Sequence, residues 1–434
     1  MSQKKYLLVV GGPTASGKTG FAIRLARHFD THILSCDSRQ FFREMSIGTA
    51  KPDAKELAAA PHHFIGNRSI TQEYNVGAYE QEALATLKGL FQEKDIVILV
   101  GGSGLYIKAL CEGLDQFPEV PLAIRNEVED FYQQKGLAAL QTAVQKADPE
   151  YFAEADQQNP HRLIRALSIY KASGQPFSSF RQKQSAARLF TPIYIQMHWP
   201  RQALYDRINQ RVDIMIEQGL LEETRQLLHY RRHTALQTVG YQELFAFMDG
   251  QYNLQAAIEL IKRNSRRYAK RQLTWMRRDG FWKHFHPGEW ETALGYIHSA
   301  IKNDWQWREY KSPLPPDLSL HFNLEKKGNA RVLTLYQNKE LSAAILLRSF
   351  KRFELIERVS LLFNLPLDTI RYFLHEAICR CEDALIYTKL PIHLFSLIEE
   401  WGFSRTEEDQ WPEKIKTSLE EQENHAVIGM REAL

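Results

Sequence analysis

The sequence predicts an α/β protein with a doubly wound parallel sheet, and two observations lead to that prediction. Short apolar segments at residues 6–10 and 95–100 are each followed by a helical pattern, and a further short apolar segment lies at residues 32–36. The segment at 95–100 is closed by two glycines, as in a strand buried on both faces of a parallel sheet. Ligands of such sheets gather at the carboxyl ends of the strands, so the residues after each strand are the candidates for function.

The composition of the 434-residue chain is that of an ordinary globular protein. Hydrophobic residues make up 44% and charged residues 25%, which excludes disorder, collagen and coiled coil for most of the chain. The 55 lysines and arginines nearly balance the 52 acidic residues, so the net charge of +3 does not by itself indicate a nucleic-acid partner. Any basic surface for such a partner must therefore be local.

No segment predicts a membrane partner or export. No apolar run reaches the roughly 18 residues that a membrane span needs, and the N-terminus lacks the pattern of a signal peptide. The spacing of the four cysteines, Cys36, Cys111, Cys379 and Cys381, fits neither a disulfide framework nor a zinc site. We therefore expect a cytoplasmic protein.

The predicted core consists of residues 1–120 and 190–300, with C-terminal helices that begin near residue 201. Residues 121–189 interrupt it with a helical pattern, in which Asn159 and Pro160 have the types that favour a helix N-cap and first position. We expect this part to be a helical insertion.

The rest of the chain is predicted to be a linker and a separate module. Three prolines within residues 301–318 exclude a helix and a central strand there. In residues 319–434, apolar residues recur at helical spacing from Leu355 to Phe363, which predicts a mostly helical module. We expect it to be an accessory domain that packs on the core or adds an RNA contact, although its acid-rich tail argues against RNA contact at the very end.

The strongest motif is Gly-x-x-x-x-Gly-Lys-Thr, between a predicted strand and a predicted helix as the motif requires. Backbone N–H groups at such a helix N-terminus bind phosphate oxygens, Lys18 supplies positive charge and Thr19 offers a hydroxyl to Mg²⁺. The motif makes the core P-loop NTPase-like. The predicted diphosphate-binding residues are Gly12, Pro13, Thr14, Ala15, Ser16, Gly17, Lys18 and Thr19.

The acidic residue of an ordinary P-loop NTPase is missing from its usual place. That residue normally ends a hydrophobic strand and holds or orders the metal, but here the most hydrophobic strand ends in Gly101 and Gly102. A carboxylate follows the second strand instead, at Asp37. Alone, Asp37 is equally well explained as a turn former. Next to a phosphate loop it becomes the leading candidate for a general base.

Several motifs in one order together resemble the bacterial tRNA dimethylallyltransferases, also called tRNA isopentenyltransferases. They are residues 12–19, 36–40 (Cys-Asp-Ser-Arg-Gln), 47–52 (Ile-Gly-Thr-Ala-Lys-Pro), 61–63 (Pro-His-His), 100–106, 159–167, 238–241 and 267–275. The resemblance covers about residues 4 to 300 and implies that the helical insertion at residues 121–189 binds tRNA. It implies transfer of a dimethylallyl group from dimethylallyl diphosphate to the N6 amine of the adenosine 3′ of the anticodon, with release of pyrophosphate, in tRNAs that read codons beginning with U.

The resemblance also implies roles, a cofactor and partners. Asp37 would be the general base, Arg211 would clamp the diphosphate, and the hydroxyl of Ser103, where the family usually has Thr, would orient the base or the diphosphate. Thr19 would bind the Mg²⁺ cofactor. The partners would be the tRNA anticodon stem-loop and dimethylallyl diphosphate, with no membrane, and the enzyme would be a cytoplasmic monomer.

A basic segment offers a local surface for RNA. Eight lysines and arginines and no acid lie between residues 262 and 278, although a solvated helix face is the more common reason for such a run. With the resemblance, phosphate contact becomes the better explanation. The residues expected to contact tRNA are Asp37, Ser38, Arg39, Gln40, Ser103, Arg125, His161, Arg162, Leu163, Arg165, Gly240, Tyr241, Lys270 and Arg271. One departure is Gln237-Thr238, where bacterial members often have Arg-Cys.

Two other functions remain open from the residues alone. The phosphate loop by itself also predicts a small-molecule P-loop kinase, against which the missing strand-end acid argues. An adenylate isopentenyltransferase would share the phosphate loop and the base but would accept a free nucleotide. The helical insertion and the basic helix favour a polymer substrate instead.

Overall fold

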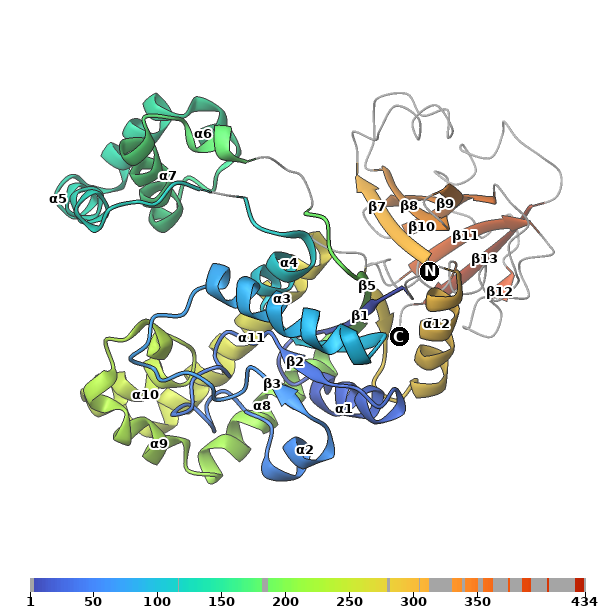
Figure 1. Ribbon diagram of the computed structural model, residues 1–434, viewed down its shortest axis with the longest axis horizontal. Coiled ribbons are helices and arrows are strands. Elements are labelled where there is room, and N and C mark those ends of the chain that lie inside the picture. The colour runs from blue at the N-terminus through green and yellow to red at the C-terminus, as the bar shows by residue number, and fades with distance from the viewer. Residues whose placement is uncertain are drawn as a thin grey trace. The chain divides into compact units, whose positions relative to one another are not determined.

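The computed structural model divides into two compact units (Figure 1), one formed by Lys108–Arg188 and the other by Met1–Ile107 with Leu189–Leu434. The described residues are 4–115, 117–181, 186–278, 282–303, 305–311, 330–337, 340–349, 354–361, 374, 385–391, 404–405 and 426–432. Within these residues, no helix combines the length and the apolar character that a membrane crossing requires.

A parallel sheet forms the centre of the larger unit, as the alternating pattern predicts. Its strand order is β3-β2-β4-β1-β5-β6, and each pairing is parallel. The central strand β1 is buried along its whole length because it is paired on both sides, with Val9 opposite Leu99 and Tyr194. The strands are β1 (Tyr6–Gly11), β2 (Ile33–Ser35), β3 (His62–His63), β4 (Ile96–Gly101), β5 (Thr191–Met197) and β6 (Lys283–Phe285). The edge strands β3 and β6 are too short for periodicity to predict them.

Helices surround this sheet, and α11 packs against both α8 and α10. The helices of this unit include α1 (Lys18–His28), α2 (Ala54–Ala59), α3 (Val76–Glu93), α8 (Arg201–Glu217), α9 (Leu220–Gln226), α10 (Tyr241–Met248), α11 (Leu254–Arg278) and α12 (Trp290–Asn303). A further helix, α4 (Gly104–Glu112), begins in this unit and ends in the other. Short 3₁₀ turns lie at Leu228–Tyr230 and Thr234–Leu236.

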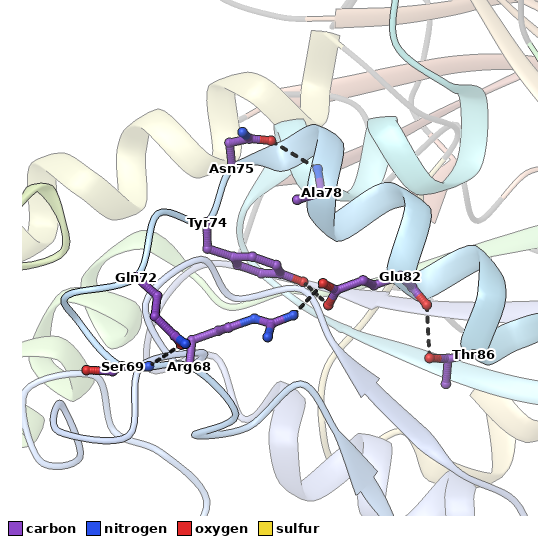
Figure 2. A network of polar contacts seen from close by, with 8 residues as sticks. All are labelled: Arg68, Ser69, Gln72, Tyr74, Asn75, Ala78, Glu82 and Thr86. Atoms are coloured by element: carbon purple, nitrogen blue, oxygen red, sulfur yellow. Dashed lines mark hydrogen bonds and ion pairs between the residues drawn. The ribbon is translucent and has the colours of Figure 1, made fainter.

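A polar network fixes the entry of the chain into α3 (Figure 2). Asn75 caps the helix by accepting a hydrogen bond from the N–H of Ala78 at 3.0 Å. Glu82, one turn further on, forms an ion pair with Arg68 and accepts a hydrogen bond from the hydroxyl of Tyr74 at 3.0 Å. The Arg68 guanidinium also lies over the Tyr74 ring, 4.7 Å from its centroid. The loop before α3 is thereby held to the helix.

The smaller unit is helical, as predicted for the insertion. It contains α5 (Leu122–Ala147), which is broken at Gly136, α6 (Pro149–Glu154), α7 (Pro160–Ser173) and the 3₁₀ turn Phe177–Phe180. The side chain of Asn159 accepts from the N–H of Arg162, and Pro160 follows it, so the predicted N-cap is present. The compact unit spans Lys108–Arg188, and Arg188 at its end donates to the carbonyls of Ala109 and Leu110 near its start.

The sequence predicts a mostly helical C-terminal module, but its described residues are strands, apart from Leu374, which is helical. Together with β7 these strands form a seven-stranded sheet with the order β12-β13-β11-β10-β9-β8-β7. Its strands are β7 (Trp305–Lys311), β8 (Ala330–Gln337), β9 (Glu340–Ser349), β10 (Glu354–Leu361), β11 (Leu385–Pro391), β12 (Ser404–Arg405) and β13 (Ala426–Glu432). Strand β7 also falls inside the predicted linker of residues 301–318, whose prolines lie outside the described residues.

A β-bulge explains why the spacing resembled a helix. The register shifts between Ile356 and Arg358, so Ile356 is opposite Leu347 and Val359 is opposite Ile345. Positions three apart in β10 therefore face positions two apart in β9, and an apolar spacing of three arises in a strand. The other apolar residues of that pattern, and the Cys379-Arg380-Cys381 segment, lie outside the described residues.

Candidate active site

The phosphate loop lies between β1 and α1, where the motif predicts it. Gly17 has a φ of 85°, and no side chain caps the helix that follows, so the first N–H groups of α1 are left for a ligand. Lys18 folds back over the loop and donates to the carbonyl of Pro13 at 3.3 Å. The loop is therefore arranged to receive an anion.

Two arginines of α8 and the tryptophan before it bind the loop from one side. Trp199 donates from Nε1 to the carbonyl of Ser16 at 2.9 Å, and Arg207 donates from Nε to the carbonyl of Ala15 at the same distance. Arg211 reaches the hydroxyl of Thr14 at 3.4 Å. Arg207 is thus committed to a loop carbonyl, whereas Arg211 lines the cavity in front of the loop.

A buried glutamine of α11 binds the loop from the other side. Gln272, only 6% exposed, accepts from the N–H of Thr14 and donates to the carbonyl of Gly102, both at 3.0 Å. A Cβ at Gly102 would lie 2.1 Å from Nε2 of Gln272, and one at Gly104 would lie 2.0 Å from the Trp275 ring. The glycines that end β4 therefore make room for α11. Periodicity carries no signal for this contact, and the sequence analysis missed Gln272.

Asp37 lies in the same cavity as the phosphate loop. It forms the expected turn as well, since its Oδ1 accepts from the N–H of Arg39 at 3.0 Å and its carbonyl accepts from Gln40. No other hydrogen bond to the carboxylate occurs within the described ranges, so Oδ2 faces no competing donor there. Asp37 can thus serve as turn former and proton acceptor at once.

Ser103 supports this turn from the end of β4. Its Oγ accepts from the N–H of Ser38 at 3.2 Å and lies 3.3 Å from the Ser38 hydroxyl. Neither serine is among the residues that line the cavity. The predicted role of Ser103 in orienting the base therefore has a geometric basis in the turn next to Asp37.

The site is poor in solvent and rich in positive charge. Desolvation, followed by the charge of Arg211, lowers the pKa of Lys18 to about 8, although Asp37 acts in the opposite direction. Desolvation also lowers the pKa of Arg211. Desolvation and the nearby charge of Asp37 raise the pKa of Tyr268, on α11, to about 12. An incoming anion would relieve the mutual repulsion of Lys18 and Arg211.

The cavity is lined by both polar and apolar residues. Of the predicted residues, those that line it are Thr14, Ala15, Ser16, Gly17, Lys18, Thr19, Asp37, Arg39, Gln40, Arg211 and Gly240. The apolar lining comes from Ile208, Val212, Met215, Leu220, Val239 and Ile261. A charged headgroup and a short hydrocarbon group thus have complementary surfaces within one cavity.

Two of the residues predicted to contact tRNA have buried side chains. Tyr241 and Leu163 are both 0% exposed and belong to the hydrophobic cores of their respective units. Arg39 donates from Nη1 to the carbonyls of Thr234 and Ala235. These side chains hold the protein together in this structure.

Six of the remaining predicted RNA contacts are exposed at the surface, whereas Gly240 is buried and Asp37, Ser38, Gln40 and Ser103 are partly buried. His161, Arg162 and Arg165 are exposed on α7, where Arg165 lies 5.1 Å above the Phe117 ring, and Arg125 is exposed on α5. In the larger unit, Lys270 and Arg271 are exposed on the basic half of α11. Each unit thus presents cations of its own.

Comparisons with known proteins identify the family. The model of the IPP transferase family matches residues 40–279. The chain belongs to the IPP transferase family. Among its relatives, the tRNA dimethylallyltransferase of Christiangramia forsetii is 51% identical over 68% of this chain and 98% of that protein, and that of Cytophaga hutchinsonii is 46% identical over 69% and 98%. The family predicted from the motifs is confirmed.

Solved structures of this IPP transferase family share the fold. The tRNA isopentenylpyrophosphate transferase of Bacillus halodurans is 33% identical, with a TM-score of 0.52, over 69% of this chain and 97% of that one. A eukaryotic dimethylallyltransferase acting on tRNA has the same fold. It is 23% identical, with a TM-score of 0.59, over 75% of this chain and 81% of that one. The P-loop-like core predicted from the sequence is therefore confirmed.

Proposed function

We propose that this protein transfers a dimethylallyl group from dimethylallyl diphosphate to tRNA and releases pyrophosphate. The observation that carries the proposal is one cavity lined by a phosphate loop, a carboxylate and a set of apolar side chains. The tRNA dimethylallyltransferases that match the chain over nearly their whole length support it. The acceptor we propose is the N6 amine of the adenosine 3′ of the anticodon, in tRNAs that read codons beginning with U.

The phosphate loop and its cations would bind the leaving group. Carbon–oxygen cleavage in an allylic diphosphate leaves the bonding electron pair on pyrophosphate, so charge develops on oxygens that the loop N–H groups can reach. Lys18 and Arg211 would neutralise that charge in a desolvated site, where each interaction is stronger than in water. Gln272, Trp199 and Arg207 keep the loop in place through hydrogen bonds to its backbone.

Asp37 would take the proton that the acceptor amine loses. The amine nitrogen forms the new carbon–nitrogen bond, and its excess proton passes to Oδ2, because Oδ1 is occupied by the N–H of Arg39. The turn supported by Ser103 would hold the carboxylate in one orientation during this step. The product leaves with a secondary amine, and Asp37 returns its proton to solvent.

The oxygen ligands near the loop fit a magnesium ion that arrives with the diphosphate. The described residues contain no cluster of three or more metal-ligating side chains, but Mg²⁺ usually binds through one or two protein oxygens and the substrate phosphates. The Thr19 hydroxyl would hold it beside Asp37 in this cavity. When bound, Mg²⁺ would supply additional positive charge to the leaving pyrophosphate.

Exposed cations on both units support RNA as the acceptor. We propose that His161, Arg162 and Arg165 of α7, Arg125 of α5, and Lys270 and Arg271 of α11 contact the anticodon stem-loop. The target adenosine would leave its stack to reach an enclosed site. We also propose that the enzyme is a cytoplasmic monomer, as the family resemblance implies.

A transfer assay with two competing acceptors tests the function. Labelled dimethylallyl diphosphate, Mg²⁺, an anticodon stem-loop with adenosine 3′ of the anticodon, and AMP are incubated with the enzyme. Label on RNA that is lost in Asp37→Ala is the expected result. Label on AMP alone would indicate an adenylate isopentenyltransferase, and label on neither would return the phosphate loop to a kinase function.

A further inference from the structure

Glu223 of α9 binds a loop that lines the active-site cavity. One carboxylate oxygen, Oε2, accepts from the N–H groups of Ser46 and Ile47 at 2.9 and 2.8 Å. The other, Oε1, accepts from the N–H of Gly48 at 3.0 Å and from the hydroxyl of Tyr241 at 2.6 Å. Four donors thus converge on one carboxylate, and together they hold it in one orientation.

This carboxylate joins two parts of the chain that both reach the cavity. Gly48 and Thr49 line it from the loop, and Gly240 lines it next to Tyr241. Tyr241 is fully buried, and a Cβ at position 48 would lie 2.6 Å from its ring, so the loop approaches as closely as glycine allows. Burial and Glu223 both raise the pKa of the Tyr241 hydroxyl, which therefore stays protonated as a donor.

The same loop is fastened from its other side as well. Lys51 donates to the carbonyls of Phe42 and Arg43, at 2.8 and 3.1 Å. Gln40, which lines the cavity, donates to the carbonyls of Thr49 and Ala50. These bonds use carbonyls, whereas the N–H groups of residues 46–48 all donate to Glu223.

We propose that Glu223 is a positioning residue of the transfer reaction, which sets the cavity wall formed by residues 46–49 and 238–240 relative to the phosphate loop. The inference rests on the proposed function. It separates two tasks of the cavity. The phosphate loop, held in place by Trp199, Arg207 and Gln272, binds the diphosphate, and the wall held by Glu223 positions the acceptor. A change at Glu223 should therefore affect transfer to RNA and leave pyrophosphate binding intact.

The test compares Glu223→Gln and Tyr241→Phe with Glu222→Gln. Glu222 is an exposed neighbour on the same helix, paired with Arg225, and is the matched control. Glu223→Gln keeps the size of the side chain but brings a donor amide toward backbone donors. We expect kcat/KM for the stem-loop to fall by about tenfold to a hundredfold, with pyrophosphate affinity within about twofold of the wild type and the control unchanged.

Amide hydrogen exchange provides a readout that does not depend on activity. In Glu223→Gln the amides of residues 46–48 should exchange at least about tenfold faster, while those of the phosphate loop keep their protection. In Tyr241→Phe the increase in exchange should be smaller. If the Glu223→Gln/Tyr241→Phe double variant exchanges no faster than Glu223→Gln alone, the two residues act through their shared hydrogen bond.

Three outcomes overturn the inference. They are an unchanged kcat/KM per folded molecule, a fall in pyrophosphate affinity as large as the fall in transfer, and unchanged exchange at residues 46–48. A wild-type enzyme that transfers nothing to RNA contradicts the proposed function and the catalytic part of this inference together. Hydrogen exchange then decides separately whether Glu223 holds the wall.

Discussion

At the scale of single residues, Lys18 carries a direct consequence for pH. In the ligand-free site its pKa is about 8, because desolvation and Arg211 disfavour the charged form. A bound anion favours the charged form and raises that pKa, so binding above pH 8 must take up a proton. Folding stability without ligand changes in the opposite direction. Between about pH 8 and pH 10.5, Lys18 binds more protons in the unfolded chain than in the folded one, so its contribution to stability increases as the pH rises.

The first prediction follows for pyrophosphate binding. Its affinity should be constant below pH 8 and should then fall by up to about tenfold per pH unit, relative to a Lys18→Arg variant whose guanidinium stays charged. Calorimetric titration between pH 7 and 9.5 measures the pyrophosphate affinity of the wild type and of Lys18→Arg. Pyrophosphate itself titrates in this range, so only the difference between the two proteins is informative. Parallel curves would contradict the lowered pKa.

The second prediction concerns Asp37. Asparagine preserves Oδ1, and with it the hydrogen bond from Arg39 that forms the turn. Asp37→Asn should therefore fold normally and bind pyrophosphate as the wild type does, while single-turnover transfer falls by about 10² to 10⁴-fold. Asp30→Asn, at an exposed position paired with Lys94, is the control. A variant that keeps a tenth of the wild-type rate would exclude Asp37 as the general base.

At the scale of elements, the contact between β4 and α11 explains an unusual strand end. Where an ordinary phosphate-loop enzyme has an acid, this chain has glycines, because Gln272 and Trp275 of α11 occupy the space above them. The helix thereby connects the end of β4 with Thr14 of the phosphate loop. Glycines can replace the usual acid at the end of β4 because the proposed reaction does not hydrolyse a triphosphate. The proposed carboxylate, Asp37, follows the end of β2 instead.

The third prediction tests this packing. Gly102→Ala should destabilise the fold by about 1–3 kcal/mol, because its Cβ would lie 2.1 Å from a buried amide that is bonded at both ends. Gly89→Ala, inside α3 with no atom within 4 Å of its Cβ, should stabilise by about 0.5–1 kcal/mol. Denaturant unfolding measures both. Equal effects at the two positions would show that α11 does not limit the space at Gly102.

At the scale of the whole molecule, the relatives match about two thirds of this chain and nearly all of their own length. The family model covers residues 40–279, which include the helical unit. The strands β7–β13 lie outside that match. None of the described residues that line the cavity comes from the sheet that these strands form, so its role can be tested separately from catalysis.

The fourth prediction is that a chain ending at Asn303 still transfers dimethylallyl groups to a stem-loop. Ending there removes β7 together with its sheet, so no unpaired strand is left at the surface. Turnover, affinity for full-length tRNA and thermal stability are compared with those of the intact protein. A loss of affinity or stability would support an accessory domain, whereas no change in any of the three would contradict that role.

How far the sequence leads depends on how local each interaction is. The phosphate loop, the Asp37 turn and the Asn159 cap each form within a few residues, so their sequence patterns predict them. The strand β10 shows where periodicity fails, because one bulge changes a two-residue repeat into a spacing of three. Tyr241 shows a second limit, since its motif suggested an RNA contact and its side chain lies in the core.

Family, core fold and the chemistry of the phosphate loop could thus be derived from the sequence alone, because they reside in short, contiguous motifs. Folding alone decided which distant groups complete the site. Gln272 meets Thr14 across 258 residues of chain, and Glu223 meets Gly48 across 175. Such contacts leave no periodic trace in the sequence, since each requires one atom to reach another only after the sheet and its helices have packed.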